Sequence, residues 1–91
     1  MREASVSVIN SLGLHARAAA KLVRAASGFT SRITVTESRR GVTADAKSIL
    51  SVLTLAASIG TTVLIKAEGE DESDAVDAVS ELFADGFGEL K

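Results

Sequence analysis

The only histidine of the chain, His15, lies in residues 11–23 (SLGLHARAAAKLV), and Arg17 follows it two residues later. A neutral imidazole nitrogen is a competent nucleophile near neutral pH, and a guanidinium can bind a phosphate through two parallel hydrogen bonds. Apolar residues at helical spacing predict a helix over Ala16–Ser27, ended by Gly28. His15 would then stand at a helix start, where the first N–H groups lack intrahelical partners and favour an anion.

An unreactive alternative stays open, because a lone histidine at such a junction is often only a capping residue. Two observations favour chemistry: the free N–H groups at this junction, and a pair of cations in an electrostatically unfavourable place. Arg17 and Lys21 lie near the positive end of the predicted helix dipole, where a cation costs about 0.3–1 kcal/mol. Between residues 4 and 36 there is no Asp or Glu, so no carboxylate nearby in sequence can orient the imidazole as in a Ser-His-Asp arrangement. An ordinary hydrolase is therefore least favoured, and phosphorylation of His15 itself is the chemistry we expect.

Composition limits the other kinds of site. There is no Cys, which excludes disulfides and zinc–thiolate sites, and one His cannot build an imidazole-rich metal centre. Mg²⁺ or Ca²⁺ bound through carboxylates stays open, but no stretch has the spacing of a calcium loop, and we expect no metal and no cofactor. The only aromatic residues are three Phe and the pI is about 5.3, so nucleic-acid binding is a weak hypothesis. The charges are nevertheless segregated: residues 1–48 carry 8 basic and 3 acidic groups, and residues 49–91 carry 2 basic and 9 acidic groups. The basic half surrounds His15.

The chain is expected to be one domain over residues 1–91, since this length allows a single two-layer core. Its first residues alternate polar and apolar side chains, unlike a signal peptide, and no run approaches the length of a membrane span. The expected location is the cytoplasm, without membrane insertion.

Hydrophobic periodicity predicts the order β-α-β-β-α-β-α, which indicates an α+β fold with a mostly antiparallel sheet covered on one face by helices. The predicted strands are residues 4–9, residues 31–37, a short strand at Val42 after a turn at 38–41, and residues 61–67. A last helix begins with acidic residues at 70–74 and stops at Gly86; its predicted apolar face is Ala75, Ala78, Val79 and Leu82.

The second helix is predicted over residues 47–58, with a buried stripe of Ile49, Val52, Leu53 and Ala56. Leu50 and Leu55 lie off that stripe, so the helix is apolar around more of its circumference than one core face requires. We expect Ile49, Leu50 and Leu53 to form a partly exposed apolar patch near His15; the alternative is that all three belong to the core. Ser48 at the helix start is typical of a capping residue.

GLHARAAAKLV, followed by a hairpin and then DAKSIL, resembles the histidine-containing phosphocarrier (HPr) family of the bacterial phosphoenolpyruvate-dependent phosphotransferase system. The resemblance runs over residues 3–88. It implies an open-faced sandwich of four antiparallel strands and three helices. It also implies that His15 accepts a phosphoryl group from phosphorylated Enzyme I and passes it to a IIA-type protein or domain, as a carrier rather than a stand-alone enzyme. The phosphate would be neutralised by Arg17 and held by the amides of Ala16 and Arg17.

The resemblance implies further roles on the same surface. Ser48 matches the serine that an ATP-dependent HPr kinase/phosphorylase modifies in many bacteria. A monomer would contact its partners through an apolar centre with a basic rim. The residues expected in that surface are Lys21, Arg24, Lys47, Ile49, Leu50 and Leu53. The runner-up hypothesis is a non-catalytic binding module that uses the same basic stripe and apolar patch, with His15 only capping the helix.

Two positions depart from the family pattern. Ala18 stands where Pro is usual and Ser51 where Gly is usual. Proline in a first helical turn fixes φ, so Ala18 leaves this turn less preorganised. Arg-Ala-Ala-Ala at this place is more typical of the nitrogen-related branch (NPr) and of regulatory phosphocarriers than of sugar-transport proteins.

Overall fold

A computed structural model of the chain describes residues 1–89 and has the predicted order of elements. The strands are β1 (Arg2–Ser7), β2 (Arg32–Glu37), β3 (Val42–Asp45) and β4 (Thr62–Glu68). The helices are α1 (Ala16–Ser27), α2 (Ile49–Leu53) and α3 (Glu72–Ala84), with a short 3₁₀ turn at Gly86–Gly88. The predicted α+β fold is confirmed.

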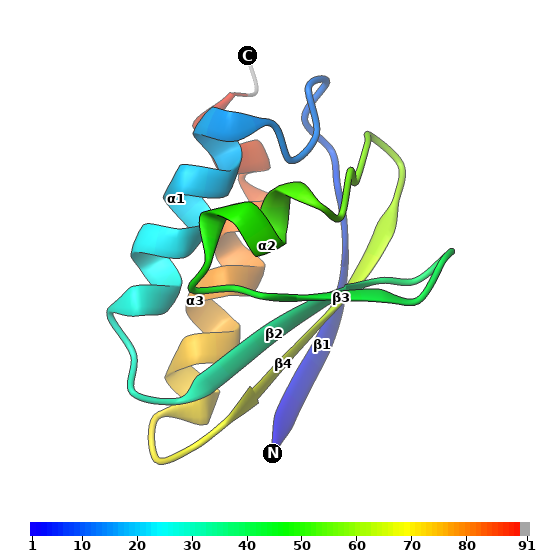
Figure 1. Cartoon of the computed structure of the whole chain (residues 1–91). Coiled ribbons are helices and arrows are strands. Elements are labelled where there is room, and N and C mark those ends of the chain that lie inside the picture. Colours follow the sequence, from blue (N-terminus) through cyan, green and yellow to red (C-terminus); the bar gives the residue numbers. More distant parts are fainter. Residues whose placement is uncertain (90–91) are drawn as a thin grey trace.

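The four strands form one sheet in the order β1-β4-β2-β3, and every neighbouring pair is antiparallel. All three helices lie on the same face of this sheet (Figure 1). The alternation in β4 turns Val63, Ile65 and Ala67 toward the helices, where they are fully or almost fully buried. Among the described residues no helix lies on the opposite face of the sheet, so the architecture is an open-faced sandwich.

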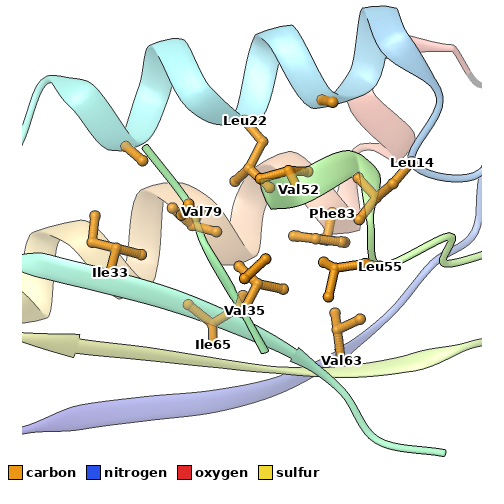
Figure 2. Packing of buried hydrophobic residues seen from close by; sticks show 14 of the residues in the cluster. Leu14, Leu22, Ile33, Val35, Val52, Leu55, Val63, Ile65, Val79 and Phe83 are labelled. Atoms are coloured by element: carbon orange, nitrogen blue, oxygen red, sulfur yellow. The ribbon is translucent and has the colours of Figure 1, made fainter. Parts of the chain in front are cut away.

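The core fills the space between the helices and the sheet (Figure 2). Leu22 of α1, Val52 of α2 and Phe83 of α3 meet the inward side chains of the strands, and all three are fully buried. Leu14, one residue before His15, is also part of this core. Burial of Leu14 therefore holds the backbone in place immediately before the histidine.

The loop that carries His15 is tied to the loop between α2 and β4. The Leu14 N–H donates to the Ala57 carbonyl at 2.9 Å, and the Gly60 N–H donates to the Val8 carbonyl at 2.8 Å. Gly13 has a φ of +62°, in the left-handed region that favours glycine. These contacts fix the position of His15 at the start of α1.

The prediction for the second helix is wrong in its extent. α2 begins after Ser48 and ends at Leu53, because Ala56 has a φ of +47° that no right-handed helix contains. The backbone reversal places Leu55 in the core instead of Ala56, which is exposed. Of the predicted buried stripe, only Val52 is buried, while Ile49 and Leu53 are 40% and 38% exposed.

The predicted apolar face of the last helix is partly wrong. Ala75 and Val79 are buried as predicted, and Val76 and Phe83 are buried as well. Ala78 and Leu82 are only half-buried, although Leu82 packs against the core. α3 contacts both the sheet and α1, so its buried stripe is wider and shifted from the one a single contact surface would require.

Asp71, just before α3, ties this helix to the start of β2. Its carboxylate accepts hydrogen bonds from the Thr30 and Ser31 amides, each at 2.9 Å, and from the Ser31 hydroxyl. The hydroxyl contact, followed by the amides, lowers the pKa of Asp71 to about 2. Asp71, one of the acidic residues predicted to interact favourably with the helix dipole, therefore also holds the loop before β2 in place.

No helix within residues 1–89 combines the length and the apolar character that crossing a membrane requires.

Candidate functional site

His15 is the N-cap of α1, in extended backbone conformation with φ −73° and ψ 178°. Its Nδ1 accepts a hydrogen bond from the Arg17 N–H at 3.3 Å, and its carbonyl accepts the Ala19 N–H at 2.8 Å. The ring thus replaces the serine or aspartate side chain that usually caps a helix. Its side chain keeps 23% of its surface exposed, so a partner can reach it.

A carboxylate lies at the other edge of the ring. The Nε2 atom of His15 is 2.5 Å from Oε2 of Glu89, which is 74 residues away in the chain. Glu89 Oε1 accepts a hydrogen bond from Asn10 Nδ2 at 2.9 Å. The expectation that no carboxylate is near in sequence holds, but the fold supplies one from the far end of the chain.

These two contacts agree on one tautomer of the imidazole. A carboxylate oxygen accepts, so Nε2 carries the proton, and an amide N–H donates, so Nδ1 presents its lone pair. Nδ1 is therefore the ring nitrogen that could act as a nucleophile, and it faces the first turn of α1. A group bonded to Nδ1 would lie beside the amides that have no acceptor within the helix.

Glu89 is ionised in this setting. Its hydrogen bond from Asn10, followed by its contact with His15 and the charge of Arg17, lowers the pKa of the Glu89 carboxyl. Arg17 Nε is 3.6 Å from Glu89 Oε2, and the Arg17 side chain is 68% exposed. Since exposed ion pairs are weak, the guanidinium is free to turn toward another anion.

The 3₁₀ turn after α3 brings Glu89 to the site, and in Figure 1 this last segment lies beside the start of α1. Gly86, Phe87 and Gly88 all have positive φ, at 59°, 56° and 73°. Phe87 is 1% exposed and packs edge to face on Phe83, with ring centroids 4.9 Å apart. The Lys21 ammonium donates to the Phe87 carbonyl at 2.6 Å. We call residues 86–89 the C-terminal strap.

The predicted basic residues fall into two groups. Lys21 and Lys47 are half-buried, and the Lys47 ammonium donates to the Phe29 carbonyl at 2.7 Å. Arg17 and Arg24, in contrast, are exposed. Of these four, the two arginines are thus the more exposed cations. The role of Lys21, Arg24 and Lys47 in partner binding, and that of Arg17 beside a phosphate, stay predictions.

Ser48 is the N-cap of α2, and its hydroxyl accepts the Ser51 N–H at 3.3 Å. The Ser51 hydroxyl in turn accepts the Asp45 N–H at 2.9 Å, a contact that a glycine at position 51 would lack. Next to Ser48, Leu50 is 76% exposed, beside the partly exposed Ile49 and Leu53. The short helix therefore presents a capping serine and an apolar surface together, whose function stays a prediction.

Sequence reasoning missed Glu89 and Asn10. Asn10 is 1% exposed, and its Nδ2 donates both to the Gly13 carbonyl and to Glu89. The only signal for Glu89 was the GFG sequence before it, which allows the tight turn that aims it back at α1.

The chain is similar over nearly its whole length to known proteins. The family model described as PTS HPr component phosphorylation site matches residues 2–85. The chain is 48% identical to phosphocarrier protein HPr of Cupriavidus necator and 49% identical to that of Xylella fastidiosa, each over 98% of both chains. HPr-C-His from Thermoanaerobacter tengcongensis is 40% identical and superposes with a TM-score of 0.93 over 100% of both chains. HPr from Bacillus anthracis is 33% identical with a TM-score of 0.84, over 90% of this chain and 95% of that one.

Proposed function

This chain belongs to the histidine-containing phosphocarrier (HPr) family of the phosphotransferase system, and we propose that it carries the phosphoryl group on Nδ1 of His15. The group comes from phosphorylated Enzyme I and leaves to a IIA-type protein or domain. The observation that carries the proposal is the hydrogen bond from the Arg17 N–H to Nδ1, which directs the lone pair of that nitrogen at the start of α1. The chain acts as a carrier and not as a stand-alone enzyme.

The transfer is a substitution at phosphorus. The Nδ1 lone pair forms the new N–P bond as the bond from phosphorus to the donor breaks, and the donor leaves with that electron pair. The phosphoryl oxygens then lie beside the amides of Ala16 and Arg17, at the first turn of α1. Their negative charge is stabilised by these N–H groups and by the exposed Arg17 guanidinium.

The surroundings of His15 support brief docking of acidic proteins. Arg17 and Arg24 are exposed cations on α1, and the apolar patch of Ile49, Leu50 and Leu53 lies on α2, which packs against α1. An apolar centre provides desolvated contact, and a basic rim steers acidic partners and speeds association.

The test is incubation of the wild-type chain with Enzyme I and phosphoenolpyruvate. We expect one phosphoryl group per chain that is labile in acid and stable in base, as a phosphorus–nitrogen bond requires. Nuclear magnetic resonance of the ring nitrogens should place it on Nδ1. A chain that takes up no label would contradict the carrier function, and label on Nε2 would contradict the assignment of the nucleophile.

We propose in addition that Ser48 is a regulatory phosphorylation site for an ATP-dependent HPr kinase/phosphorylase. The Ser48 hydroxyl accepts a long hydrogen bond of 3.3 Å from the Ser51 amide, and its side chain is half-buried at the start of α2. A phosphate of about −2 charge at a helix start is compatible with the backbone there, so α2 stays folded. Beside the apolar patch, this charge opposes the approach of acidic partners.

The Ser48 proposal predicts a second labelling pattern. With ATP and the kinase, we expect label on the wild type and its complete loss in Ser48→Ala. Ser51→Ala is the matched control, since it removes a neighbouring hydroxyl and leaves Ser48 intact. Label that persists in Ser48→Ala would place the phosphate elsewhere. Label that disappears only in Ser51→Ala would likewise contradict the assignment.

A further inference from the structure

Glu89 is held more firmly than a surface carboxylate near the end of a chain usually is. Its side chain is 15% exposed, and each carboxylate oxygen has a partner: Oε1 accepts from Asn10, and Oε2 faces His15 Nε2. Asn10 is itself fixed, because its Nδ2 also donates to the Gly13 carbonyl at 2.8 Å. The carboxylate is therefore aimed at one edge of the imidazole from a supported position.

The C-terminal strap maintains this aim. Phe87 is buried against Phe83, and Lys21 of α1 binds the Phe87 carbonyl at 2.6 Å. A buried aromatic ring and a charge-assisted hydrogen bond thus hold the strap two residues before Glu89. The positive φ of Phe87, 56°, is unfavourable for a non-glycine residue, so packing must hold it.

We propose that Glu89 is a positioning residue for phosphoryl transfer, which keeps the proton on Nε2 of His15 and balances the positive charge that the ring gains at phosphorylation. This inference rests on the proposed carrier function. Glu89 acts at the edge of the ring opposite to the phosphate, and the C-terminal strap is therefore a part of the site.

The tautomer of His15 determines where the proton and the electron pairs lie at each step of the transfer. Before transfer the ring is neutral, with hydrogen on Nε2 and a lone pair on Nδ1. When that pair bonds to phosphorus and the donor leaves with its own pair, the ring becomes an Nδ1-phosphoryl imidazolium, with its charge next to Glu89. On transfer to the next acceptor the N–P electron pair returns to Nδ1. The Nε2 proton stays in place through both steps.

The carboxylate acts in two ways. It excludes the other neutral tautomer, in which Nδ1 would hold the proton and have no lone pair for phosphorus. It also stabilises the charge that develops on the ring in the transition state, as an oriented carboxylate does beside a catalytic histidine. Among the described residues, the charged side chains beside the ring are Glu89 and Arg17, and the Asn10 amide supports Glu89.

The test compares the wild type with Glu89→Gln, which keeps the size of the side chain and removes its charge. By nitrogen resonance, we expect the wild-type ring to hold its proton on Nε2 and the variant to show both neutral tautomers. With Enzyme I and phosphoenolpyruvate, we expect kcat for phosphorylation to fall about tenfold and KM for the chain to stay unchanged.

Asp85→Asn is the matched control, because it removes the same charge four residues earlier, at an exposed position. It should behave as the wild type in both measurements. If Glu89→Gln keeps the Nε2 proton and the wild-type rate, the inference is overturned while the carrier function stands. A fall in rate through KM alone would make Glu89 a docking residue and would also overturn it. A wild type that takes up no label fails at the earlier step, in the carrier function itself.

Discussion

Replacing His15 with alanine is expected to remove all acid-labile phosphate that Enzyme I and phosphoenolpyruvate place on the chain. His15 is the only histidine, and there is no cysteine, so the sequence offers no second imidazole or thiol to accept the group. The fold should persist, because the lost N-cap contact to the Arg17 amide is worth only about 1 kcal/mol. Labelling followed by acid treatment, with circular dichroism as a check of folding, measures both effects.

His15→Asn separates the chemistry from the capping role. Asparagine is a good N-cap, so its side-chain oxygen can accept the Arg17 N–H, but it offers no nucleophilic nitrogen. We expect this variant to be more stable than His15→Ala and equally free of label. Acid-labile label on either variant would mean that another residue accepts the phosphoryl group.

The same pair of variants tests the binding-module hypothesis. If the chain only binds a partner through its basic stripe and apolar patch, both variants should bind that partner as the wild type does. Phosphoenolpyruvate and Enzyme I should then leave the affinity unchanged. In a carrier, by contrast, phosphorylation adds about two negative charges beside Arg17 and must alter the affinity for acidic partners.

The parts of the fold that could be predicted from sequence are those in which one local pattern determines the outcome. The bounds of α1, Ala16–Ser27, match the prediction because a clear apolar period ends at Gly28. The sheet was also predictable, since alternation in residues 31–37 and 61–67 assigns a buried face to each strand. In each of these elements, the buried residues in the structure follow the spacing of apolar residues in the sequence.

α2 was not predictable in its extent because a tertiary requirement overrides its local pattern. Residues 47–58 contain no glycine or proline to end a helix, yet the chain must turn at Ala56 to bury Leu55 and Ala57 and to reach β4. The left-handed conformation at Ala56 is unfavourable for alanine, and the buried contacts on both sides of it hold it there. Hydrophobic periodicity does not detect this balance between backbone strain at Ala56 and the burial of its neighbours.

The candidate site likewise contains residues that local spacing predicts and a residue that it does not predict. His15 and Arg17 could be found because they lie close together in sequence at a helix start, whereas Glu89 is brought to the imidazole by the tertiary fold, through α3 and the strap. Contacts between residues 74 positions apart leave no trace in local spacing. A search for carboxylates near His15 in sequence finds none between residues 4 and 36, and the one the ring uses lies near the opposite end of the chain.

Gly13→Ala is expected to cause the largest loss of stability among the single changes proposed, together with a loss of phosphoryl acceptance. A Cβ atom on Gly13 would lie 2.3 Å from the Ala57 carbonyl oxygen, and φ at this position is +62°. The same carbonyl accepts the Leu14 N–H, so moving it displaces the residue that anchors His15. Backbone strain and the steric clash together should lower the free energy of unfolding by about 3 kcal/mol.

Gly41→Ala isolates the steric part of this effect. Gly41 has a similar φ of +69°, but nothing lies within 4 Å of an added Cβ. Only the conformational cost of about 1–2 kcal/mol then applies, and His15 is undisturbed. Denaturant unfolding should therefore rank the wild type above Gly41→Ala and Gly41→Ala above Gly13→Ala, and only Gly13→Ala should accept phosphate more slowly. Equal losses of stability in the two variants would mean that the loop of His15 can yield, and that its contact with Ala57 does not set the position of the imidazole.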